Sequence, residues 1–122
     1  ENMFLFGMKT PEVEDLKKRG YVPMNYFNNN AELRKVISFI QGGINGKQFP
    51  EIANTIMHHD PYMVLADFAD YRAAQKKIDE VWKDREKWNR MSLMNIAGAG
   101  RFAADRAIND YARDIWNTKP VR

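Results

Sequence analysis

The side chains best suited to bind a metal ion are the adjacent residues His58, His59 and Asp60. Consecutive residues of a helix point about 100° apart, so the two imidazoles would not converge on one ion, and no further ligand is evident. A histidine at the C-terminal end of a helix interacts favourably with the helix dipole. The triplet therefore predicts the end of a helix rather than a metal site.

Two glycine-rich stretches could be mistaken for phosphate-binding loops. They are Gly42-Gly43 and Gly98-Ala99-Gly100. Neither has the G-x-G-x-x-G spacing after a strand or the lysine of a Walker motif. We expect the second stretch to form a turn between two helices, with glycine required at the turn.

Arginines in the last quarter of the chain could bind an anion next to two aromatic side chains. Aspartates alternate with these arginines, so ion pairs within the chain are the favoured interpretation. The arginines are Arg101, Arg106 and Arg113, the aromatic residues are Phe102 and Tyr111, and the aspartates are Asp105, Asp110 and Asp114.

Nucleophilic catalysis has no candidate in this chain. Ser38, Thr55 and Ser92 lie in helical stretches without a general base nearby, and the Glu12/Glu14 pair lies at a solvated helix end. The sequence therefore predicts no catalytic, cofactor-binding or metal-binding residue.

The spacing of apolar residues predicts an α/β fold that is predominantly helical, with about six helices and two short parallel strands. The strands are expected at Met3–Gly7 and Met63–Ala66, because short runs that are apolar on both faces suit a buried parallel strand. A strand, a helical crossover and a second strand are typical of a parallel βαβ unit.

Polar residues and glycines mark the ends of the predicted helices. Side chains that should cap helix N-termini are Thr10 (before Pro11), Asn28–Asn30 and Asp67, and Asp84 should restart the chain as a helix. Pro50 should begin a helix that buries Ile52, Ala53, Ile56 and Met57. Helices should end at Gly20 and at Gly42-Gly43, loops are expected at Tyr21–Asn30 and Ile44–Gln48, and one helix face should be lined by Tyr71, Ala74, Ile78 and Val81.

The last predicted helix carries the clearest amphipathic pattern. Ile108, Tyr111, Ala112 and Ile115 recur at the i, i+3, i+4, i+7 spacing of one buried stripe, and Trp116 extends it. We expect this helix to pack against the one that carries Trp88, Met91 and Ile96.

Composition indicates a globular chain with a mixed surface. Its 19 basic and 16 acidic residues are spread along the whole sequence, which is weak support for nucleic-acid binding. The absence of cysteine fits a reducing compartment. No run approaches the roughly 18 apolar residues that span a membrane, and we expect neither a membrane span nor a signal peptide in this stretch. Since the chain lacks a leading methionine and soon enters the apolar run at Met3, we expect it to be a piece of a longer polypeptide.

Motifs along the whole chain match one known family. The C-terminal pattern is W-x-R-M, N-I-A, G-[KR]-F and D-R-x-I-x-x-Y-A-x-x-I-W. It is carried by Trp88, Arg90, Met91, Asn95, Ile96, Ala97, Gly100, Arg101, Phe102, Asp105, Arg106, Ile108, Tyr111, Ala112, Ile115 and Trp116. Further matches are Glu1–Met8, Val13-Glu14, Leu16, Gly20-Tyr21, Tyr26, Glu32-Leu33, Met57–Asp60, Leu65–Asp67 and Tyr71. In these features the chain resembles the C-terminal end of the α-glucan phosphorylases, the glycogen, starch and maltodextrin enzymes.

The resemblance implies a cytoplasmic hexosyltransferase of the GT-B type, with two Rossmann-like domains. Such an enzyme uses orthophosphate to cleave terminal α-1,4 bonds of a glucan and releases glucose 1-phosphate. Pyridoxal phosphate on a lysine supplies its phosphate group for acid-base chemistry, and that lysine would lie upstream of Glu1. Residues 1–122 would then be one fragment of the C-terminal, cofactor-bearing domain, structural in role, inactive alone and without bound cofactor.

The chain departs from the family pattern at two places. Family members usually have serines where Ala103 and Ala104 stand, so the last helix loses its expected N-cap unless Asp105 replaces it. The loop Gly42–Gln48 is also shorter and less aromatic than usual.

Two alternatives to a piece of the enzyme are open on sequence alone. One is a free-standing helical interaction module derived from the enzyme, and the weaker one is a basic nucleic-acid binder. The expected partners of an enzyme piece are the remainder of its polypeptide, with neither nucleic acid nor membrane. An apolar face without its partner strands could also drive self-association.

Overall fold

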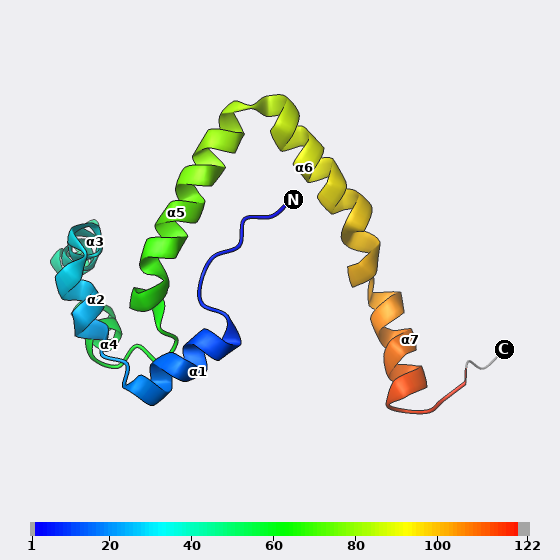
Figure 1. Ribbon diagram of the computed structural model, residues 1–122, viewed down its shortest axis with the longest axis horizontal. Helices are drawn as coiled ribbons and strands as arrows, with labels where there is room; N and C mark the ends of the chain where they lie inside the picture. The colour runs from blue at the N-terminus through cyan, green and yellow to red at the C-terminus, as the bar shows by residue number, and fades with distance from the viewer. Residues whose placement is uncertain (1, 120–122) are drawn as a thin grey trace. The chain divides into compact units, whose positions relative to one another are not determined.

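The protein is described by a computed structural model that covers residues 2–119 (Figure 1). Its regular elements are all helical. They are α1 (Thr10–Arg19), α2 (Pro23–Asn29), α3 (Ala31–Gly42), α4 (Pro50–His58), α5 (Val64–Lys83), α6 (Arg85–Gly98), the 3₁₀ helix η1 (Ala99–Phe102) and α7 (Ala104–Asp114). The first compact unit is Leu5–Lys77. The second compact unit consists of the described parts of Glu1–Phe4 and Ile78–Arg122. The predominantly helical prediction is confirmed.

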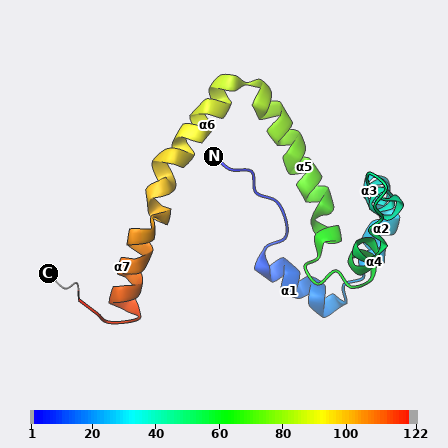
Figure 2. The same ribbon diagram turned by 180° about the vertical axis from the view of Figure 1, so that it is seen from behind.

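The core of the first unit lies among α2, α3 and α4, which are close together in both views (Figures 1 and 2). Leu33 and Ile37, one helical turn apart on α3, pack with Ala53 and Met57 of α4 and with Leu65 of α5. Each fully buried Leu or Ile side chain contributes about 2 kcal/mol through the hydrophobic effect. The predicted apolar face of α4 is correct at Ala53 and Met57 but wrong at Ile52, which is 47% exposed.

Helix α2 was not expected, because Tyr21–Asn30 reads as a polar connection. Pro23 is buried in the first turn of α2, where a proline is favoured because its missing N–H needs no partner. Met24 and Phe27, three residues apart on α2, both pack against the core. This packing stabilises a helix whose asparagines have low helix propensity.

The cap predictions are confirmed at Asn30 and at Gly20. The Asn30 side chain accepts hydrogen bonds from the backbone N–H groups of Glu32 and Leu33, both at 3.0 Å. Gly20 ends α1 with φ +86°, a conformation that favours glycine. Thr10 is not the N-cap of α1: the helix begins at Thr10, and the Glu12 carboxylate accepts from the backbone N–H of Lys9 at 2.7 Å.

The predicted strand at Met63–Ala66 is wrong, because α5 begins at Val64. Asp60, rather than Asp67, caps this helix, since its carboxylate accepts from the backbone N–H groups of Val64 and Leu65. The four apolar residues therefore enter a helix whose start is fixed by a carboxylate upstream of them.

The predicted strand at Met3–Gly7 has no neighbouring strand among residues 2–119, where the one β-bridge joins Ile44 to Lys47. A strand forms only when a second one pairs with its N–H and C=O groups. The end of this stretch is held by α5 instead. The Asp70 carboxylate accepts from the backbone N–H of Gly7 at 2.7 Å, and Asp67 accepts from that of Met8 at 2.9 Å.

In the second unit, α6 starts after Asp84, where the sequence predicts a new helix. The Asp84 side chain caps it by accepting from the backbone N–H of Lys87 at 3.0 Å. Trp82 and Trp88 meet edge to face with ring centroids 4.8 Å apart, and the Arg85 guanidinium lies 3.9 Å above the Trp82 ring. Gly98 has φ −82°, and a Cβ there would meet nothing within 4 Å, so this connection does not require glycine.

Helix α7 begins without a side-chain cap. Its N-cap residue is Ala103, and Asp105 lies in the first turn without replacing the missing cap. We predict that Ala103→Ser stabilises α7 by about 1 kcal/mol, because the hydroxyl can accept a hydrogen bond from the N–H three residues on. Helix content and the melting midpoint by circular dichroism measure the gain. Ala104→Ser is the matched control, and equal effects of both changes would contradict the capping explanation.

Candidate functional site

The structure separates the three residues that could have bound a metal ion. His58 ends α4 and His59 follows it, both with exposed side chains, whereas Asp60 is 2% exposed. The backbone N–H groups of His59 and Asp60 donate to the Thr55 carbonyl, as at the end of a helix. Within residues 2–119 no three potential ligands gather around a point. The helix-end interpretation is confirmed.

Asp60 is the buried polar centre of the first unit. Its Oδ1 accepts from the Val64 N–H at 2.9 Å, and its Oδ2 accepts from the Leu65 N–H at 2.9 Å and from the Tyr21 hydroxyl at 2.6 Å. The carboxylate thereby ties the segment before α2 to the start of α5. Three donors thus satisfy the oxygens of this buried carboxylate, as is usual for buried polar groups.

The environment of Tyr21 raises its pKa above the usual value, first through burial and then through the hydrogen bond to Asp60 and the charge of Asp60. In the unfolded chain a tyrosine ionises near pH 10, whereas the folded chain keeps the Tyr21 proton. The unfolded state then binds fewer protons, so the free energy of unfolding falls as the pH rises above about 10.

We predict that Tyr21→Phe reduces this alkaline loss of stability. Urea midpoints measured between about pH 8 and pH 11 give the comparison. Tyr62→Phe is the matched control, because the Tyr62 ring is 85% exposed. An unchanged pH dependence in the Tyr21 variant would contradict the assignment.

The arginines near the C-terminal end pair with aspartates, as the sequence predicts. Arg106 Nη1 lies 3.1 Å from an oxygen of Asp110, and Arg113 lies 2.8 Å from Asp110 and 2.6 Å from Asp114. The hydrogen bond from Arg113 lowers the pKa of Asp114. These pairs are exposed and contribute little to stability, but they use the cations that an anion site would need. Arg101 and Asp105 form none of these pairs.

The apolar stripe of α7 is present but uncovered. Ile108, Tyr111 and Ile115 are 52%, 47% and 67% exposed, so their predicted burial is wrong in this chain. The helix ends at Asp114, and beyond it the ring of Trp116 lies 5.9 Å from that of Tyr111. We call Ile108, Tyr111, Ile115 and Trp116 the α7 stripe. A set of apolar side chains on one helix face favours burial against a partner surface.

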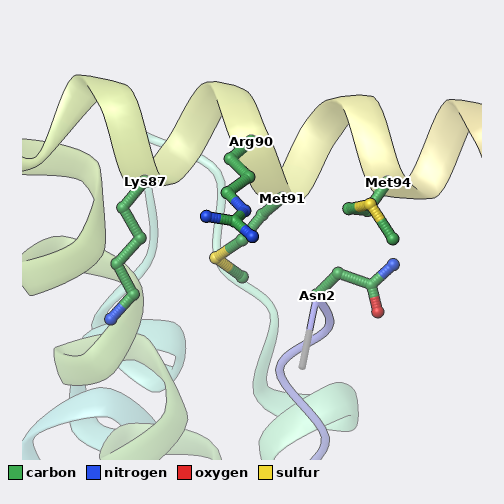
Figure 3. A pocket seen from close by; sticks show the side chains of 5 residues that line it. All are labelled: Asn2, Lys87, Arg90, Met91 and Met94. Atoms are coloured by element: carbon green, nitrogen blue, oxygen red, sulfur yellow. The ribbon is translucent and has the colours of Figure 1, made fainter.

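A cavity of about 480 Å³ beside α6 was not among the sequence candidates. Its lining consists of Lys87, Arg90, Met91 and Met94 of α6 together with Asn2 (Figure 3). The i, i+3, i+4, i+7 spacing of the four α6 residues is the sequence signal that could have grouped them on one face. Asn2 could not have been placed there, because 93 residues separate it from its partner Asn95.

The described part of the chain is thus helical and presents uncovered apolar residues. Comparison with known proteins gives its family. The carbohydrate phosphorylase profile matches residues 1–118, and the chain belongs to this family.

Among the relatives, the glycogen phosphorylase of Synechocystis sp. is 44% identical across 99% of this chain. The muscle forms of mouse and human glycogen phosphorylase are each 42% identical across the whole chain. The chain spans 15% of the length of these relatives. None of the helices within residues 2–119 combines the length and hydrophobicity that crossing a membrane requires.

Proposed function

We propose that this chain is the C-terminal part of the cofactor-bearing domain of an α-glucan phosphorylase, and that its role there is structural. The observation that carries the proposal is the family match along nearly the whole chain, combined with coverage of only 15% of each relative. The chemistry of such an enzyme then belongs to the other part of the polypeptide, and this segment completes the domain.

The parent enzyme would be a hexosyltransferase that releases glucose 1-phosphate from the ends of an α-1,4-glucan with orthophosphate. We place it in the GT-B class and in the cytoplasm. The names of the relatives support the activity, and the lack of cysteine is compatible with a reducing compartment.

The lysines of this chain do not fit the pyridoxal phosphate of such enzymes. An imine forms on a lysine that has lost its proton, which a desolvated pocket or a neighbouring cation promotes. Every lysine that the structure describes is exposed. We therefore assign cofactor binding and catalysis to residues outside this chain, and no reaction step passes through the residues described above.

Phe4–Phe6 would become a strand of the Rossmann-like sheet once the parent chain supplies its neighbours. Residues 3–6 belong to no helix, Met3 and Leu5 are 64% and 81% exposed, and α5 holds the following Gly7 in place. The α7 stripe would likewise be covered in the parent, with the C-terminal helices packed towards the N-terminal domain.

An activity assay tests the structural role. The isolated chain, mixed with glucan, orthophosphate and pyridoxal phosphate, is expected to release no glucose 1-phosphate, while the complete enzyme does so under the same conditions. Release by the isolated chain at a rate close to that of the complete enzyme would contradict the proposal.

A second prediction follows from the proposed burial of the α7 stripe in the parent. Ile108→Asp in the complete protein should lower the free energy of unfolding by about 2 kcal/mol, because a carboxylate would be buried at an apolar contact. The midpoint of thermal unfolding measures the effect. Asn109→Asp adds the same charge at the neighbouring exposed position and serves as the control. Equal small effects would show that the stripe is exposed in the parent too.

A free-standing interaction module is the second candidate, favoured by the exposure of the α7 stripe. The intact mass of the natural polypeptide distinguishes the two candidates. A mass several times the 14.3 kDa of this chain supports the enzyme, whereas a product of 14.3 kDa supports the module. For the isolated chain, we expect self-association through its uncovered apolar residues, measurable by sedimentation.

A further inference from the structure

The cavity beside α6 has the chemistry of an anion-binding site. Figure 3 shows the side chains of Lys87, Arg90 and Met94 leaving the same side of the helix. Among residues 2–119 the structure places neither cation in an ion pair, and no acidic side chain lines the cavity. Two like charges three residues apart repel each other, so an anion between them would stabilise this face.

The position of Lys87 adds a second electrostatic argument. It is the third residue of α6, in the first helical turn, where the helix dipole disfavours a cation and favours an anion. A ligand anion near Lys87 would therefore interact favourably both with the ammonium group and with the N-terminal end of the helix. The neighbouring arginine provides a planar group that can bind two oxygens at once.

Asn2, which lies below Met94 in Figure 3, is held in place by hydrogen bonds to α6. The Asn2 amide Nδ2 donates to Asn95 Oδ1 at 2.7 Å, and the Asn95 amide donates to the Asn2 carbonyl at 3.0 Å. The Asn2 amide has two N–H groups, and its hydrogen bond to Asn95 uses one of them, so the second can donate to a ligand. Met91 is half-buried and Met94 is 56% exposed, so the cavity also offers a polarizable apolar surface.

We propose that this cavity binds a small oxyanion, a phosphate or carboxylate, that carries an adjoining apolar group. Lys87 and Arg90 take the oxyanion, and Met91, Met94 and Asn2 contact the adjoining group. The site is separate from the proposed catalytic role of the parent enzyme, so a failed activity assay and a failed binding experiment have different meanings.

Calorimetric titration of the complete natural protein with phenyl phosphate tests this site. Inorganic phosphate provides the anion alone, and benzyl alcohol the apolar group alone. We expect phenyl phosphate to bind more tightly than either one and to lose affinity as salt is raised. The double change Lys87→Gln with Arg90→Gln should weaken binding roughly tenfold, which corresponds to about 1.4 kcal/mol.

Lys83→Gln is the matched control, because it removes one exposed cation at the end of α5 that does not line the cavity. Arg90→Lys, which keeps the charge, should retain part of the affinity, and an unchanged circular dichroism spectrum verifies the fold of each variant. Equal binding by the double variant, or equal binding of benzyl alcohol, would overturn the proposal. So would binding to the isolated chain but not to the complete protein, because the oxyanion would then be an acidic side chain of the parent.

Discussion

Replacing Asp60 by alanine is expected to lower the free energy of unfolding by about 4 kcal/mol, the largest effect of any single change considered for this chain. The substitution removes the acceptor of three hydrogen bonds at once, from Val64, Leu65 and Tyr21. Because Asp60 is 2% exposed, water cannot readily replace the lost partner. The start of α5 also loses its N-cap, a contribution included in this total.

Two milder variants separate the parts of this effect. Asp60→Asn keeps one acceptor oxygen and should cost about 2 kcal/mol, while Tyr21→Phe removes one donor and should cost about 1 kcal/mol. Urea denaturation followed by circular dichroism gives all three values. If Asp60→Ala cost no more than Tyr21→Phe, the carboxylate would not be the centre that holds α5 to the segment before α2.

Replacing Ile37 by alanine is expected to cost about 3 kcal/mol, because it removes buried methyl groups and leaves a cavity among the core helices. Ile37 is 2% exposed and packs with Leu33, Ala53 and Met57. The shift in the urea midpoint at constant slope measures the loss.

Val36→Ala is the matched control on the same helix. Val36 is 41% exposed, so its truncation should change stability by about 0.5 kcal/mol or less. Similar losses from the two substitutions would show that α3 does not bury the face described above.

The sequence alone determined the features that depend on neighbouring residues. Asn30 and Asp84 cap their helices through bonds to N–H groups two or three residues away, and Gly20 ends α1. The pairing of Arg106 with Asp110 is likewise an i, i+4 interaction. Such contacts form whenever the local helix forms, so residue types and spacing suffice to predict them. Family membership was also readable from the sequence, because it depends on residue identities at fixed spacing.

The tertiary structure decided the features that depend on distant partners. Helix α2 is stabilised because Met24 and Phe27 pack against the core. Helix α5 begins early because Asp60, itself bonded to Tyr21 across 39 residues, accepts its first N–H groups. The cavity beside α6 needs Asn2, brought there by Asn95. A sequence pattern records which side chains favour burial, but not which surface is available to bury them. For that reason the stripe on α7 was recognised and its exposure was not, and the apolar run at Met63 predicted a strand where a distant carboxylate starts a helix.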